Sequence, residues 1–246
     1  MSLSANTLIH FTKDKDVLKK ILEENFKVFN CRENILLGGI AKSFHIPMVS
    51  FCDIPLSQVK EHIEKYGTYG LGMTKEWGVE KGLNPVFYIS KTSNVSESYR
   101  FVYNHFFAGP NDDMGNWTEE KRAFADLLRY MKNYEATLER EGTTIQDYRF
   151  SDEREWRYVP SYTEMSDSLV LSEDYDQNKA QFDLLLKDMR LVFEPNDIKY
   201  IIINDDSEIG EFIDYLRRAK GKNYSLHDVE RLTTRILTTD QIMTDV

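Results

Sequence analysis

Apolar residues recur along the chain with two periods that alternate irregularly. Alternating or β-branched runs predict short strands at 8–11, 48–52, 69–74, 85–90, 148–159 and 199–204. Spacings of three and four predict helices near 16–22, 59–63, 95–107, 118–140, 180–189 and 209–219, with a last helix after Ser225. Because helices interrupt the strands without a regular repeat, we expect an α+β fold, with a central mixed or antiparallel sheet flanked by helices.

Two segments define the expected architecture most clearly. The run KYIIIN at 199–204 is almost continuously β-branched, which predicts a central strand. The stripe of apolar residues over 118–140 predicts the longest helix of the chain. The segment 108–117 is rich in Gly, Pro, Asn and Asp and predicts a loop, but no segment has the composition of a linker. We therefore expect one domain over 1–246.

Composition narrows the classes of protein that this chain could belong to. Its 246 residues are 41% hydrophobic and 13% aromatic, too apolar for a disordered chain. The 31 Lys and Arg against 41 Asp and Glu give a net charge of −10, which disfavours nucleic acid as the main partner. Two cysteines do not form a disulfide framework. With no signal peptide and no apolar run of membrane-spanning length, we expect a cytoplasmic protein without membrane contact.

Two segments near the amino end carry candidate binding residues. His10 and Thr12 would share one face of the first strand, where both could hydrogen-bond a polar ligand; the alternative is a histidine satisfied at a sheet edge. Ser50 and Asp53 lie where the second strand leads into a helix that begins near a proline. The alternative for this segment is structural, with Asp53 or Ser57 capping the helix.

A third segment, DEREWRY at 152–158, carries two acids and a base at two-residue spacing. If it is extended, Glu153, Glu155 and Arg157 point to one side, while Trp156 and Tyr158 point to the other and pack on the core. Neighbouring carboxylates raise one another's pKa and an adjacent arginine lowers it, so acid–base chemistry could be tuned here. The alternative is a solvated strand face on which Arg157 pairs with a glutamate.

Other motifs point away from common chemistries. The histidines do not fall at metal-ligand spacings, so we expect no dedicated metal site. Phosphate-binding glycine loops and the GxSxG nucleophile elbow are absent from the sequence. Gly67, Gly70 and Gly72 are expected to mark a turn and a close approach of two backbones.

Taken in order, several segments resemble the AbiGi family, a class of abortive phage-resistance proteins labelled as antitoxins. The segments are LIHFTK, VLKKILEENF, IPMVSFCDIPLS, YGTYGLGMTKEWG, NPVFYIS and DEREWRYVP. The resemblance extends from Leu8 to about Asn204, and VSFCDIPLS and EREWRYV are its most specific parts. It implies a bacterial phage-defence setting and a partner protein, a toxin of the same system, but no catalytic mechanism.

A second, more distant resemblance is to ADP-ribosyltransferase-like domains of the DarT type. These place a His on the first strand, a small polar residue on the next and a glutamate late in the chain. The resemblance implies that NAD is the substrate, with Glu155 and Glu153 catalytic. It assigns binding of NAD to His10 and Ser50, to which we add Asp53 and Arg157. The second motif departs from Ser-Thr-Ser, and no nicotinamide-clamping tyrosine is fixed by spacing.

Two hypotheses of function follow. In the first, the chain is an NAD-handling enzyme of phage defence, which requires His10 and Glu155 to line one cleft. In the second, it is a non-catalytic antitoxin that binds and restrains a partner toxin, for which an acidic surface is suited.

Overall fold

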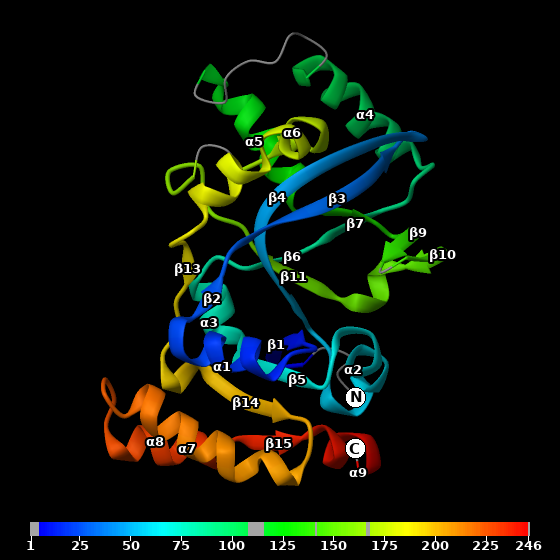
Figure 1. The fold of residues 1–246 in the computed structure, drawn as a ribbon. Helices are drawn as coiled ribbons and strands as arrows, with labels where there is room; N and C mark the ends of the chain where they lie inside the picture. Colours follow the sequence, from blue (N-terminus) through cyan, green and yellow to red (C-terminus); the bar gives the residue numbers. More distant parts are fainter. Residues whose placement is uncertain (1–4, 108–115, 141, 166–167, 246) are drawn as a thin grey trace. The chain divides into compact units, whose positions relative to one another are not determined.

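The computed structural model describes residues 5–107, 116–140, 142–165 and 168–245, so the predicted loop at 108–117 lies almost wholly outside the described residues. The chain forms two compact units (Figure 1). Unit 1 consists of Met1–Lys27, Ser50–Leu83 and Arg190–Val246, and unit 2 of Val28–Val49 and Asn84–Met189. Helices and a mixed sheet confirm the α+β class. The single domain over 1–246 stays a prediction.

Unit 1 is built on a mixed sheet with the strand order β15-β14-β5-β1-β4. Strands β14 and β15 are parallel, and the other neighbours are antiparallel. The strands of unit 1 are β1 (Thr7–Thr12), β2 (Phe26–Lys27), the end of β4 (Ile40–Cys52), β5 (Tyr69–Thr74), β13 (Arg190–Leu191), β14 (Ile198–Ile203) and β15 (Ile236–Thr238). Of these, β2 and β13 pair in a separate two-stranded sheet. The KYIIIN run therefore lies inside the sheet, as predicted, because β14 has a neighbour on each side.

Most helices of unit 1 lie near the spans that the sequence predicts, but the last helix, Thr239–Asp245, was not predicted. They are α1 (Lys15–Glu24), α2 (Lys60–Tyr66), α3 (Lys75–Glu80), α7 (Ile209–Lys220), α8 (Leu226–Thr233) and α9 (Thr239–Asp245). The side chain of Asp14 caps α1 by accepting a hydrogen bond from the backbone N–H of Asp16. The buried residues of α1 are Leu18, Ile21 and Leu22, as the helical spacing predicts.

The predicted close approach at the glycines is confirmed. Gly67 has a φ of +119°, and a Cβ atom there would lie 2.3 Å from the carbonyl oxygen of Thr12. Gly70 faces Phe11 across the β1–β5 pair, and a Cβ atom would meet that ring at 3.0 Å. Gly67 therefore requires the absence of a side chain, whereas at Gly70 the Phe11 ring would have to shift to admit one.

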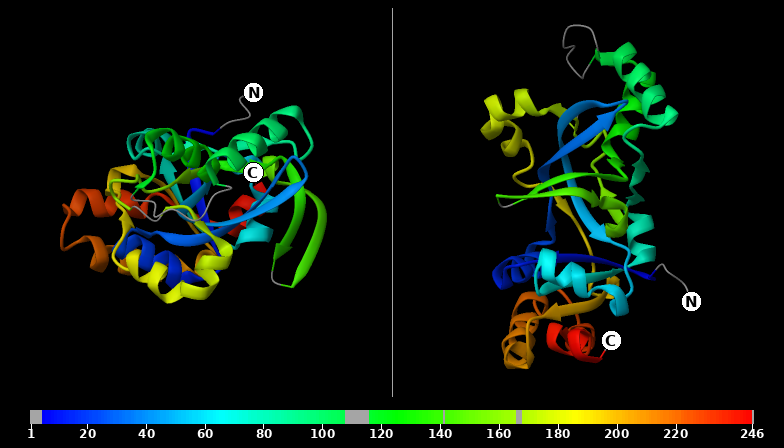
Figure 2. Two further views of the ribbon diagram at one scale, coloured as in Figure 1. Left: turned by 90° about the horizontal axis from the view of Figure 1, so that it is seen from above. Right: turned by 90° about the vertical axis from the view of Figure 1, so that its right-hand side faces the viewer.

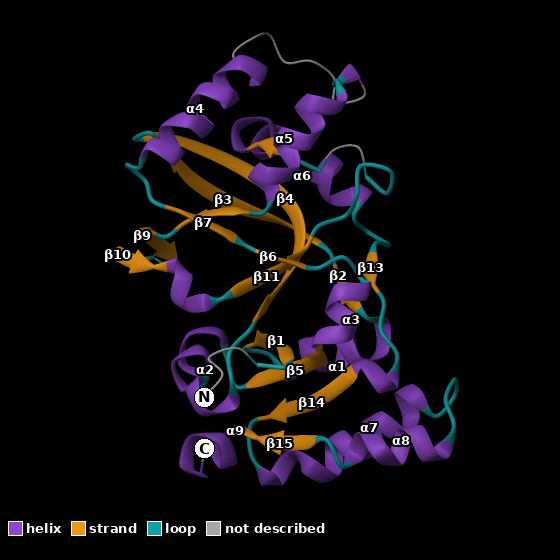
Figure 3. Cartoon of the chain, turned by 180° about the vertical axis from the view of Figure 1, so that it is seen from behind, coloured by secondary structure: helices purple, strands orange, loops and turns teal. Residues whose placement is uncertain are grey.

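Unit 2 combines a long hairpin with shorter strands and helices (Figure 3). Its strands are β3 (Phe29–Leu37), most of β4, β6 (Asn84–Pro85), β7 (Phe87–Ile89), β8 (Met131–Asn133), β9 (Glu135–Arg140), β10 (Thr143–Arg149), β11 (Glu155–Tyr158) and β12 (Val170–Leu171). Its helices are α4 (Asn94–Phe107), α5 (Glu119–Arg129) and α6 (Ser172–Leu185). Residues of β3, β4, α4 and α5 form one apolar core, which includes Phe44, Tyr103 and Phe124.

The predicted helix over 118–140 is wrong beyond Arg129. Helix α5 ends there, and the chain continues as β8, which pairs in parallel with β7, and then as β9. Met131 is buried in the same core as Phe124 and Leu128, so one stripe of apolar residues fits both structures. Pairing with β7, a contact distant in sequence, decides the strand.

The predicted strand over 148–159 is interrupted. Residues Phe150–Glu153 form a 3₁₀ turn between β10 and β11. Arg154 follows in the left-handed conformation, with a φ of 44°, so the alternation of side chains restarts at Glu155.

Candidate functional site

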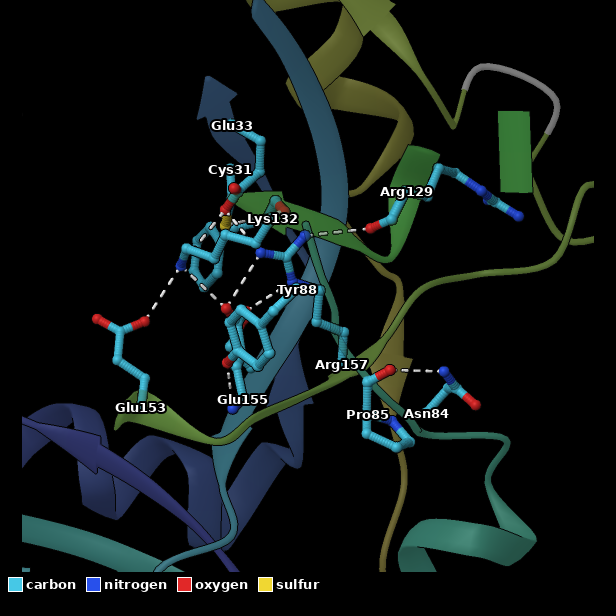
Figure 4. Close-up of polar contacts among 12 residues, drawn as sticks. Cys31, Glu33, Asn84, Pro85, Tyr88, Arg129, Lys132, Glu153, Glu155 and Arg157 are labelled. Atoms are coloured by element: carbon cyan, nitrogen blue, oxygen red, sulfur yellow. Dashed lines mark hydrogen bonds and ion pairs between the residues drawn. The ribbon is translucent and has the colours of Figure 1, made fainter. Parts of the chain in front are cut away.

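A network of charged side chains lies inside unit 2, centred on β11 (Figure 4). The guanidinium of Arg157 forms two bonds to the carboxylate of Glu155, with Nε–Oε1 at 2.6 Å and Nη2–Oε2 at 3.1 Å. Nη2 also lies 2.9 Å from a carboxylate oxygen of Glu33 on β3, and Nη1 donates to the carbonyl of Arg129 at 3.1 Å. All three nitrogens of the guanidinium group are therefore engaged.

Lys132 on β8 joins the three acids of the network. Its Nζ lies 3.0 Å from Glu155, 3.2 Å from Glu153 and 4.0 Å from Glu33. The hydroxyl of Tyr148 donates to the other carboxylate oxygen of Glu153 at 3.0 Å. Three carboxylates and two cations thus form one network with a formal charge of −1.

Local backbone structure brings these groups together from four segments. The parallel register of β7 and β8 sets Tyr88 opposite Lys132, and the Tyr88 hydroxyl accepts the backbone N–H of Glu155 at 2.9 Å. The left-handed residue Arg154 separates Glu153 from β11, yet both glutamates contact Lys132. Their meeting therefore results from the turn rather than from a shared strand face.

The expected orientation of this segment is reversed. Arg157 is fully buried and Glu155 is 7% exposed, whereas Trp156 and Tyr158 are only half-buried. The expectation that the aromatic side packs on the core is wrong. The alternative of a solvated charged face is wrong too, although Arg157 does pair with a glutamate, as that alternative held. The cause is pairing: a buried arginine becomes tolerable when carboxylates and a carbonyl satisfy its donors.

The network determines the protonation of its members. Burial raises the pKa of Glu155, but the charges of Arg157 and Lys132 outweigh it, so that pKa lies well below its usual value. Burial lowers the pKa of Lys132, and the three glutamates reverse this effect, so that the pKa lies above its usual value. Glu155 and Lys132 are therefore both charged at neutral pH. Burial, and to a lesser extent the charge of Glu33, raises the pKa of the Cys31 thiol to about 11. This thiol is therefore protonated at neutral pH.

The candidate residues of unit 1 form two separate contacts. His10 is half-buried against Phe26 and Phe51, and its Nδ1 lies 2.8 Å from the carbonyl oxygen of Ser50. Because a carbonyl only accepts, we assign the ring proton to Nδ1. Burial lowers the pKa of His10, although this hydrogen bond opposes the shift, so the ring is neutral at pH 7.

Asp53 does not cap a helix, which corrects one structural alternative. Its Oδ2 lies 2.7 Å from Nζ of Lys75, and its Oδ1 accepts the backbone N–H of Ala5 at 2.9 Å. The 3₁₀ turn that follows, Leu56–Gln58, has Pro55 at its N-cap and no side-chain cap from either Asp53 or Ser57. Asp53 therefore fixes the start of the chain and of α3 (Lys75–Glu80) to the end of β4.

The six candidate residues thus divide into two groups. Glu153, Glu155 and Arg157 meet in unit 2, and in unit 1 His10 contacts Ser50 while Asp53 binds elsewhere. A cleft shared by His10 and Glu155 would involve both units and stays a prediction. Within the described residues, no group of three or more His, Cys, Asp or Glu side chains is placed to hold a metal ion.

Two members of the network were missed in the sequence. Lys132 was hidden in the helix wrongly extended past Arg129. Glu33 lies on β3, which pairs with β4 around Gly38 and Gly39, both with positive φ. Two adjacent glycines between β-rich runs are a hairpin signal, which could have identified this strand.

Comparison with known proteins places the chain in a family. A family model described as "Putative abortive phage resistance protein AbiGi, antitoxin" matches residues 15–204. The chain belongs to the AbiGi family. It is also similar to the "Abortive phage resistance protein AbiGi" of Lactococcus lactis subsp. cremoris, with 26% identity over 230 residues, covering 83% of this chain and 90% of that protein. The AbiGi family implies a role in abortive phage resistance.

These comparisons do not confirm the resemblance to ADP-ribosyltransferase-like domains, and no solved structure matches this AbiGi chain. The AbiGi match includes every candidate residue except His10, which lies before its first matched position. No helix among the described residues has both the length and the apolar character needed to cross a membrane.

Proposed function

We propose that this chain serves abortive phage resistance as an antitoxin, by binding and restraining a protein partner of the same defence system. The observation that carries this proposal is the state of the two predicted catalytic acids. Both carboxylate oxygens of Glu155 are bonded to Arg157, and those of Glu153 are bonded to Tyr148 and Lys132.

This pairing favours binding over catalysis for a physical reason. A carboxylate that stabilises an oxocarbenium-like transition state must direct its charge at the substrate. The charge of Glu155 is directed at Arg157 and Lys132, which lie 2.6 Å and 3.0 Å away and would have to be displaced first. Breaking such a buried pair costs about 3–5 kcal/mol. The family description, which includes the word antitoxin, agrees with a restraining role.

The test is co-expression with the protein encoded by the neighbouring gene. We expect that protein alone to arrest bacterial growth, and this chain to restore growth and to co-elute with it as one complex. Lack of both rescue and co-elution would contradict the proposal.

An assay for NAD consumption tests the competing enzyme hypothesis directly. We expect the purified chain to consume no NAD above a heat-denatured control. Turnover that is lost in His10→Ala, with an unchanged circular dichroism spectrum, would instead support the enzyme and the cleft between His10 and Glu155.

A further inference from the structure

Helix α6, like α4, buries few of its side chains. Of its 14 residues only Ser172 and Tyr175 are buried, whereas α5 buries five of its 11 residues. Leu184 is 66% exposed and Leu185 is 49% exposed. Helices in proteins owe most of their stability to an apolar face packed on other elements, and α6 buries little of that kind.

The inner side of α6 is attached through polar contacts. The Tyr175 hydroxyl donates to Asp183 at 2.6 Å, and Nδ2 of Asn30 on β3 donates to the same oxygen at 3.1 Å. The hydroxyls of Ser172 and Ser43 lie 2.8 Å apart. These bonds fix α6 to the β3/β4 hairpin and leave its leucines outside the core. In the right-hand view of Figure 2, α6 (yellow) lies beside this hairpin, and no other helix of unit 2 among the described residues covers its outer side.

The outer surface has two parts, separated by a kink at Asn178, where φ is −125°. Before the kink lie Glu173 and Asp174, neither of which has an ion pair among the described residues, whereas the charge of Asp176 acts on His45 on the inner side. After the kink, Lys179 is paired with Asp183 at 2.9 Å, and the helix ends in the two exposed leucines. Phe29 on β3, next to the Asn30 that binds Asp183, is 57% exposed as well.

We propose that the outer face of α6 is the surface with which this chain binds its partner, and that the partner presents an apolar pocket bordered by basic side chains. The inference rests on the proposed function and adds to it a contact surface and a chemistry. Leu184 and Leu185 enter the pocket, which removes their apolar surface from water. The unpaired acids on the first half of α6 face the basic border, which speeds association.

The experiment measures binding of the purified product of the neighbouring gene to surface-immobilised, full-length variants of this chain. We expect the double variant Leu184→Gln/Leu185→Gln to raise Kd at least tenfold. The matched control is Leu226→Gln on α8, because Leu226 is 74% exposed in unit 1, and we expect it to leave Kd unchanged. All three substitutions are at exposed positions, and equal thermal midpoints verify folding.

Charge is tested separately through the association rate. We expect Glu173→Lys to slow association and to weaken its dependence on salt, whereas Glu80→Lys, an exposed acid at the end of α3, leaves both unchanged. Equal effects of the two charge reversals would show that the net negative charge of the whole chain attracts the partner. That result would overturn the assignment of the basic border to α6.

The remaining outcomes separate the two proposals. Wild-type binding that survives the leucine substitutions overturns the α6 surface and leaves partner restraint standing. A wild-type chain that does not bind the neighbouring protein overturns both. A wild-type dimer in sedimentation that Leu184→Gln/Leu185→Gln dissociates overturns the inference too, because a second copy then occupies the face.

Discussion

Arg157 is the residue on which the charged network of unit 2 depends. It is fully buried, and its guanidinium bonds two carboxylates and a backbone carbonyl. A buried pair adds little stability over an apolar pair of the same shape, but loss of one partner leaves an uncompensated charge. The network therefore restricts which single substitutions unit 2 tolerates.

Replacement of Arg157 tests this dependence. We expect Arg157→Met to lower the free energy of unfolding by about 3–5 kcal/mol, because Glu155 and Glu33 then share a buried site with Lys132 as their only remaining cation in the network. Urea denaturation followed by circular dichroism measures the change. The control Lys179→Met removes a cation of an exposed ion pair on α6 and should leave the midpoint nearly unchanged. Equal stabilities of the two variants would contradict the role of the network.

The low pKa of Glu155 makes stability depend on pH in a defined direction. The folded-state pKa lies below the unfolded value of about 4.3, so the unfolded chain binds more protons and stability rises with pH through this range. We expect the contribution of Glu155 to be complete above about pH 5 and to be lost as the pH falls toward the folded-state pKa. The contribution is measured from urea midpoints at a series of pH values from about 6 to about 3, a range that brackets the unfolded pKa. Glu155→Gln should flatten the slope; an unchanged slope would assign the acid sensitivity to other carboxylates.

At the scale of single elements, local sequence signals predict helices and turns reliably where the deciding contacts join residues close in sequence. The buried stripe of α1 and the proline before the first 3₁₀ turn lie where the sequence placed them. The strand β8 lies where a helix was predicted, because β7 pairs with it across more than 40 residues of chain. Apolar spacing alone does not distinguish these outcomes when one stripe suits both.

Glycine substitutions test the element contacts of unit 1. We expect Gly67→Ala to cost at least about 2 kcal/mol, since its φ is +119° and its new Cβ would meet the carbonyl of Thr12. Gly82 also has a positive φ, +75°, but nothing lies within 4 Å of a Cβ atom there. Gly82→Ala should therefore show only the left-handed backbone cost, about 1 kcal/mol. Thermal denaturation compares the two, and equal losses would exclude the close approach to β1.

On the scale of the whole chain, the region matched by the family model ends before the folded unit 1 does. The matched region ends at residue 204, directly after β14, yet β14 pairs in parallel with β15 beyond it. Phe212 and Leu216 of α7 are fully buried. Residues 205–245 therefore contribute a strand to the sheet and buried side chains to the core of unit 1.

Truncation after Asn204 tests this dependence. We expect the shortened chain to lose the cooperative unfolding of unit 1, because Ile201–Ile203 lose their partners on β15 and a buried face is exposed to water. Dispersion of amide signals in NMR spectra reports the loss. A truncated chain with the full-length spectrum for residues of β1 and β5 would contradict it.

The sequence by itself determined the α+β class, most helix starts, the central strand predicted at 199–204 and the family, because these depend on contacts between near neighbours or on whole segments of residues. It also drew attention to Glu153, Glu155 and Arg157. Only the tertiary structure decided that these three are buried and paired, since Lys132 and Glu33 reach them from strands distant in sequence. Burial of a charge depends on partners that no local pattern specifies.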